Sequence, residues 1–143
     1  MSADELLWKV IQEWVAKAES DLVAATELLK LGKRSPTEAI CFHAQQCVEK
    51  YVKALMVAHW LDVPKTHILN VLLSKLPLES HPALTQVEQD RLNEYAVGVR
   101  YPETKSPTLS EARHAVALAR RVRADVRRKV PNAALRRPKP HAR

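Results

Sequence analysis

Amide and charged side chains recur at helical spacing in the first half of the chain. Gln46, Glu49, Lys50 and Lys53 lie three or four positions apart, so the four side chains fall on one face of a helix. Glu49 followed by Lys53 is a favourable ion pair on such a face. Two interpretations stay open: the row is a solvated helix surface, or it is a polar network that joins helices or binds a ligand.

A second candidate site is the tripeptide Arg100-Tyr101-Pro102, which follows a predicted helix and precedes a loop. The guanidinium group of arginine can hold a carboxylate or a phosphate group through two parallel hydrogen bonds. The alternative is that Arg100 pairs with Glu49 or Asp21 inside the protein. Both roles are compatible if the pair forms the floor of a cleft.

Histidines add two further candidates. The hydroxyl group of Thr66 can cap a short helix, and His67 beside it can then contact a ligand through a hydrogen bond. His43 and Cys47 stand four positions apart, but a tetrahedral metal site needs four ligands and no second pair has suitable spacing. We therefore expect no metal site. We also expect no other cofactor, and we name no catalytic residue. The candidate ligand-binding residues are Gln46, Glu49, Lys53, His67, Arg100 and Tyr101.

Arginines give one side of the last predicted helix a positive charge. Arg113, Arg120 and Arg127 recur every seven residues, opposite a stripe of alanine and valine. This basic surface is either a solvated helix face or a binding surface for RNA or an acidic partner. It contains no aromatic residues on which single-stranded bases could stack. The net charge of the whole chain is +7, which is compatible with either partner.

The elements that must position these residues are helices. Apolar residues at three- and four-residue steps predict an amphipathic helix over residues 4–31, ended by Gly32. Ser35 as a cap, followed by Pro36 at the first helical position, predicts a second long helix that continues to about residue 61.

In the second half of the chain, the sequence predicts two shorter helices and one long helix. Several prolines limit the next two helices to about residues 67–76 and 84–99. Thr108 followed by Glu111 forms a capping box, which opens a last helix that continues to about Val130.

Composition sets the class of protein. A chain of 143 residues with 46% hydrophobic and 27% charged residues is typical of one globular domain. Only two glycines occur, which disfavours tight β-hairpins. The sequence predicts an all-α, up-and-down bundle of four to five helices over residues 1–130. Residues 131–143 form a basic, proline-containing tail that we expect to be disordered.

Location follows from what the sequence lacks. No apolar run approaches the length of a membrane-spanning helix, and acidic residues at the start of the chain do not fit a signal peptide. Two cysteines six positions apart in one helix do not form a disulfide framework. We expect a cytoplasmic protein with no membrane partner.

Four blocks of sequence, in order, resemble the HEPN domain family. They are Trp14-Val15-Ala16-Lys17-Ala18-Glu19-Ser20-Asp21-Leu22, His43-Ala44-Gln45-Gln46-Cys47-Val48-Glu49-Lys50-Tyr51-Val52-Lys53-Ala54-Leu55, Lys65-Thr66-His67-Ile68-Leu69 and Arg100-Tyr101-Pro102. The resemblance implies a bundle of four or five helices that forms a homodimer. It also implies a companion role beside a minimal nucleotidyltransferase, in a toxin–antitoxin-like pair that binds a nucleotide or nucleic acid. The Gln/Glu/Lys row would then face a polar cleft.

Ribonuclease members of that family carry an arginine, four to six intervening residues and a histidine near the start of the last helix. The positions after Arg100 that should hold the histidine are occupied by Lys105, Ser106 and Pro107. The single formal match, Arg136 with His141, lies in the tail. The resemblance therefore favours a binding module over an enzyme.

Two alternatives stay open beside the binding module. One is a divergent ribonuclease toxin in which His67 or His114 replaces the missing base. The other is a structural dimer that binds a partner protein through its basic last helix.

Overall fold

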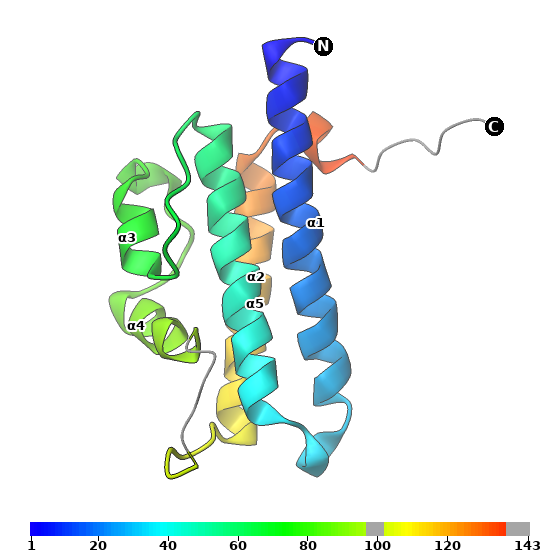
Figure 1. The fold of residues 1–143 in the computed structure, drawn as a ribbon, viewed down its shortest axis with the longest axis vertical. Helices are drawn as coiled ribbons and strands as arrows, with labels where there is room; N and C mark the ends of the chain where they lie inside the picture. The colour runs from blue at the N-terminus through cyan, green and yellow to red at the C-terminus, as the bar shows by residue number, and fades with distance from the viewer. Residues whose placement is uncertain (97–101, 137–143) are drawn as a thin grey trace, which may run out of the picture.

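Three long helices form the body of the protein, for which a computed structural model describes residues 1–96 and 102–136. They are α1 (Ala3–Leu29), α2 (Thr37–Ala58) and α5 (Leu109–Lys129), and they run side by side in Figure 1. The helices α1 and α5 each pack along α2, whereas they contact one another less extensively. The central helix α2 is therefore the element against which the rest of the bundle is arranged.

Two shorter helices cover another side of α2. They are α3 (Leu69–Ser74) and α4 (Gln86–Tyr95), which pack against each other and against α2, beside it in Figure 1. Single turns of 3₁₀ helix complete the described elements: η1 (Gly32–Arg34), η2 (Leu78–Ser80) and η3 (Asn132–Leu135). The described residues contain helices and no strand, which confirms the predicted all-α bundle.

The core explains why the long helices form. Along α1 the buried apolar residues are spaced three or four positions apart, so that one stripe faces α2. Helix α2 is buried on most sides, because α1, α5, α3 and α4 all surround it. Within the described residues, no helix is both long enough and apolar enough to cross a membrane.

Both ends of α2 differ from the prediction. The helix begins at Thr37, and the hydroxyl group of Ser35 donates to the carbonyl oxygen of Leu29, 3.4 Å away, instead of capping α2. The helix ends at Ala58 rather than at residue 61, because Trp60 adopts a left-handed backbone conformation with φ of 58°. Gly32 adopts the left-handed backbone conformation that was predicted to end the first helix, with φ of 58°, although α1 itself already ends at Leu29.

The ends of the later helices follow their caps. The predicted capping box of Thr108 and Glu111 is present at the start of α5, and Thr85 with Glu88 forms another at the start of α4. Helix α3 is shorter than predicted: the hydroxyl of Thr66 accepts from the backbone of Ile68, in the turn before the helix. Helix α4 is also shorter than predicted: it ends at Tyr95, with Ala96 as its C-cap, and not at residue 99.

Packing continues past α5 into the segment that the sequence assigned to the tail. Residues 132–135 form η3, and Ala134 is fully buried. The side-chain amide of Gln12 in α1 donates to the carbonyl oxygens of Ala133 and Arg136, at 3.3 and 3.1 Å. A small apolar residue and these two hydrogen bonds hold the segment against α1, so the packed region extends beyond Val130. Residues 137–143 lie outside the described part of the chain.

Candidate functional site

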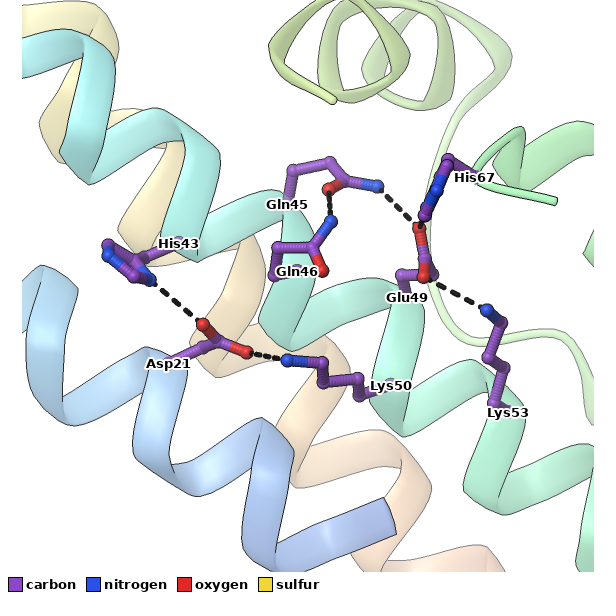
Figure 2. A network of polar contacts seen from close by, with 8 residues as sticks. All are labelled: Asp21, His43, Gln45, Gln46, Glu49, Lys50, Lys53 and His67. Carbon is purple, nitrogen blue, oxygen red and sulfur yellow. Dashed lines mark hydrogen bonds and ion pairs between the residues drawn. The ribbon is translucent and has the colours of Figure 1, made fainter. Parts of the chain in front are cut away.

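Glu49 of α2 is the centre of a buried polar network (Figure 2). Its carboxylate accepts hydrogen bonds from the Nε2 of Gln45 at 3.1 Å, the Nζ of Lys53 at 3.0 Å and the Nδ1 of His67 at 2.8 Å. Glu49 is 3% exposed and Lys53 is 7% exposed. The row is therefore not a solvated helix surface; it is a polar network, and the predicted Glu49–Lys53 ion pair is part of it.

Lys53 is also held by an aromatic ring. Its Nζ lies 5.5 Å from the centroid of the ring of Trp14, a residue of α1, and 3.0 Å from the carboxylate of Glu49. A buried ammonium group costs several kcal/mol unless it is paired, and the carboxylate and the ring face together offset that cost. The charge of Lys53 is therefore matched within the protein.

Gln46 joins the network through its neighbour. Its Nε2 donates to the Oε1 of Gln45 at 2.7 Å, and Gln45 in turn donates to Glu49. Gln45 is fully buried, and burying an amide is stable only when it is hydrogen-bonded. Gln45 was not among the candidate ligand-binding residues, although its position four residues before Glu49 on one helix could have indicated this hydrogen bond.

A second carboxylate, that of Asp21 in α1, is also paired with one histidine and one lysine of α2. Asp21 contacts the Nδ1 of His43 at 2.8 Å and the Nζ of Lys50 at 2.5 Å, as Figure 2 shows. Asp21 is 8% exposed. The sequence placed Lys50 on the polar face and named Asp21 as a partner for Arg100; it did not identify the pairing with His43. The seven-residue spacing of His43 and Lys50, two helical turns, could have indicated it.

Each carboxylate thus orients one imidazole and neutralises one ammonium group. Because a carboxylate only accepts hydrogen bonds, the neutral imidazole carries its proton on Nδ1, which leaves the lone pair on Nε2. The ring of His67 is 67% exposed and that of His43 is 33% exposed. The arrangement therefore presents two oriented imidazoles beside α2, each sharing its carboxylate with a lysine.

The other predicted residues divide into two groups. The predicted site residues Arg100 and Tyr101 lie outside the described residues. On α5, Arg113 and Arg120 are exposed and Arg127 is partly buried. Arg120 donates to Thr26 at 3.3 Å, and Arg127 donates to the Tyr51 hydroxyl at 3.5 Å. The basic surface is thus partly tied to α1 and α2.

A third polar cluster surrounds Glu19, and the sequence did not find it. The Nε of Arg123 donates to Glu19 at 2.5 Å, the hydroxyl of Tyr51 donates to the same carboxylate, and Arg127 lies 3.8 Å away. Burial alone would raise the pKa of Glu19, but the hydrogen bonds from Tyr51 and Arg123 and the nearby charges lower it below its ordinary value. Burial and the bond to Glu19 raise the pKa of Tyr51.

Two comparisons with known proteins found matches. The family model described as the HEPN domain matches residues 11–129. The crystal structure of TT1696 from Thermus thermophilus is similar, with 30% sequence identity and a TM-score of 0.69, over 85% of this chain and 99% of that chain. Among curated proteins, none matches this chain.

Proposed function

The chain belongs to the HEPN domain family, and from this premise we propose that it is a binding module that takes a nucleotide or nucleic acid at the α2 network. By the α2 network we mean the contacts of Glu49 and Asp21 with their histidines, lysines and glutamines (Figure 2). In this proposal the chain is a homodimer or the companion subunit of a minimal nucleotidyltransferase in a toxin–antitoxin-like pair. The network provides the ligand-binding groups, and the chain has no catalytic residue of its own.

The observation that carries the proposal is the exposed His67 fixed by the buried Glu49. A partly solvated histidine gains little stability from one hydrogen bond, yet its ring is held at 2.8 Å by a carboxylate that already has two other donors. Holding a side chain in one rotamer before the ligand arrives reduces the entropy lost on binding. The contact therefore fits a role in ligand binding better than a role in stability.

The chemistry of the site fits a phosphorylated ribose. In its neutral form the Nε2 of His67 accepts a hydrogen bond, for example from a ribose hydroxyl group. Lys50 has three donors, of which Asp21 uses one among the contacts described, and its side chain is 22% exposed. A phosphate oxygen can use the remaining donors. Arg100 and Tyr101, which the sequence assigned to the same site, would add a guanidinium group and a ring.

The experiment is a thermal-shift screen of the full chain against AMP, ADP and ATP. A ligand that binds only the folded state stabilises it by roughly 2.7 kcal/mol at a hundredfold excess over its dissociation constant. We expect a shift that His67→Ala removes. The matched control is His114→Ala, since His114 is an exposed histidine on α5 and contacts no member of the network among the described residues. If no nucleotide shifts the wild-type protein, the nucleotide proposal is wrong.

A second candidate function uses the same geometry. An imidazole whose Nδ1 is held by a carboxylate is an arrangement that general bases use, so His67 with Glu49 also supports a divergent ribonuclease. Incubating wild-type protein and His67→Ala with a structured RNA tests it. Because the sequence analysis named His67 and His114 as alternative bases, His114→Ala is tested beside it. Cleavage that is lost in either variant would replace the binding module by an enzyme, and the variant that loses it identifies the base.

A further inference from the structure

The seam between α1 and α5 is an open groove that the proposed nucleotide site does not use. Two cavities lie along it, of about 380 and 420 Å³, and both are open to solvent. Glu19 and Arg123 line both cavities, so their ion pair divides the groove in the middle. The segment 132–136 closes one wall of the first cavity through Ala134, Leu135 and Arg136.

The charge of the groove is mainly positive. Its arginines are Arg120, Arg123, Arg127 and Arg136, and its carboxylates are Glu19 and Glu27. Glu27 already forms an ion pair with Lys30 at 2.7 Å, and Glu19 pairs most closely with Arg123.

Three of the four arginines therefore keep unused donors. In the described part of the chain, the guanidinium group of Arg120 contacts only the hydroxyl group of Thr26. The guanidinium group of Arg127 lies 3.5 Å from the Tyr51 hydroxyl and 3.8 Å from Glu19, which are both long contacts. Arg136 is exposed, and no contact of its guanidinium group appears within the described residues. An acidic group can pair with each of them.

The wall of the groove is apolar between these charges. Val23 of α1 lines both cavities and is 58% exposed. Val15 and Leu135 line the first cavity, and Leu22 lines the second. An exposed valine between two cavities offers apolar surface to a partner, and arginines at both ends select an acidic one.

We propose that this groove binds an acidic, amphipathic helix of a partner protein. Helices recognise hydrophobic grooves between helices by an apolar face, with charges beside it. Arg120 and Arg127 are seven residues apart on α5, which is two turns or about 10 Å. A partner helix that runs along the groove with glutamates seven residues apart reproduces that spacing, while its apolar side chains contact Val23.

The layout of the bundle supports a helix rather than a small anion. The helices α1 and α5 both pack on α2, and α3 and α4 lie against α2 elsewhere, so the α1–α5 seam is a place where a fourth long helix completes a bundle. A small-molecule pocket buries most of its ligand, whereas these cavities are open along the groove. Glu19 already shows how a carboxylate sits between the arginines of α5.

The test measures binding of a synthetic helix to the full chain by fluorescence anisotropy. The probe is a labelled peptide of leucine and glutamate heptads, about four turns long, and the control probe carries lysine in place of glutamate. We expect the acidic probe to bind and the basic one not to bind. No binding of the acidic probe to the wild-type protein overturns the proposal.

Two sets of variants locate the site. Arg120→Glu with Arg136→Glu changes exposed residues and leaves Arg127 with its contacts, and it should weaken binding about tenfold or more. The matched control is Arg113→Glu with Arg91→Glu, which changes the net charge equally at exposed positions outside both cavities. Equal weakening in both double variants would show general charge attraction and contradict a defined groove.

Val23→Asp separates an acidic helix from other occupants. This exposed change adds charge where the apolar face should dock, so binding of the acidic probe should fall strongly while the melting temperature stays close to that of the wild-type protein. If Val23→Asp instead turns a wild-type dimer into a monomer in light scattering, the groove holds a second copy of the chain. If an RNA oligonucleotide displaces the probe and its own binding is unaffected by Val23→Asp, the surface is a nucleic-acid site. Either result overturns the proposal.

Discussion

The two polar regions that α1 helps to form both pair carboxylates with basic side chains, but they do so in opposite ways. In the α2 network, Glu49 and Asp21 are 3% and 8% exposed, and each lies next to one lysine and one histidine. In the α1–α5 groove, the carboxylate of Glu19 is one-third exposed and faces arginines of α5. The first region is closed and balanced in charge, while the second is open and has an excess of positive charge.

The difference shows how burial decides what a charge can do. A buried carboxylate must be matched by donors within the protein, so its loss leaves unpaired groups that water cannot reach. A carboxylate that is one-third exposed is partly solvated already, and its loss frees arginines for another partner. Changes in the α2 network should therefore act first on stability, and changes in the groove should act first on binding.

Glu49→Ala should have the largest effect, because it removes the hub of the closed region. The ammonium group of Lys53 would lose its carboxylate while it stays buried. Breaking a buried pair on one side costs about 3–5 kcal/mol. Urea denaturation followed by circular dichroism should show that loss in the free energy of unfolding.

The control for this prediction removes both charges together. In Glu49→Leu with Lys53→Met, no charged group remains unpaired, and replacing a buried ion pair by apolar residues is often close to neutral. The double variant should therefore be more stable than Glu49→Ala. If the single variant is as stable as the wild-type protein, Lys53 does not depend on Glu49 to balance its charge. The proposed difference between a closed and an open region would then be wrong.

Asp21→Ala should cost less, about 1–3 kcal/mol by the same measurement. Its partners are less buried: the side chain of Lys50 is 22% exposed and that of His43 is 33% exposed. Both can turn toward water once the carboxylate is gone. A loss as large as that of Glu49→Ala would mean that exposure of the partners does not set the cost.

The sequence predicted the closed region better than the open one, because its contacts are more local. Glu49 and Lys53 are four positions apart on one helix, so their pairing follows from helix geometry. Glu19 and Arg123 are 104 positions apart, and no periodic pattern connects residues on two helices of different register. The helices themselves were predictable from apolar spacing and capping boxes. The end of α2 at Ala58 was not, because it depends on the left-handed backbone conformation of Trp60, which no sequence pattern indicates.

Glu19→Gln should have a smaller effect that depends on pH. The pKa of Glu19 is lowered in the folded protein, chiefly because the hydrogen bonds from Tyr51 and Arg123 outweigh the effect of burial. A lowered pKa contributes stability above the pKa of the unfolded chain, and that contribution is lost as the pH falls through the folded value. The variant should be about 1 kcal/mol less stable at neutral pH.

That difference should shrink as the pH falls into the acidic range, where Glu19 of the wild-type protein takes up its proton. Unfolding curves of both proteins at a series of pH values measure it. Glu88→Gln is a useful comparison, because the pKa of Glu88 is lowered at the α4 capping box, away from the groove. If the difference in the free energy of unfolding stays constant with pH, the charge of Glu19 does not contribute to it, and the contact with Arg123 stabilises the fold through packing and hydrogen bonding.

His67→Ala should have the smallest effect on stability, although His67 belongs to the closed region. Its ring is 67% exposed, and after its removal Glu49 keeps the hydrogen bonds from Gln45 and Lys53. The free energy of unfolding should therefore change by no more than about 0.5 kcal/mol. A larger loss, with nucleotide binding intact, would make His67 a structural partner of Glu49. A small loss, with nucleotide binding abolished, would separate the two roles inside one network: Glu49 holds the fold, and His67 contacts the ligand.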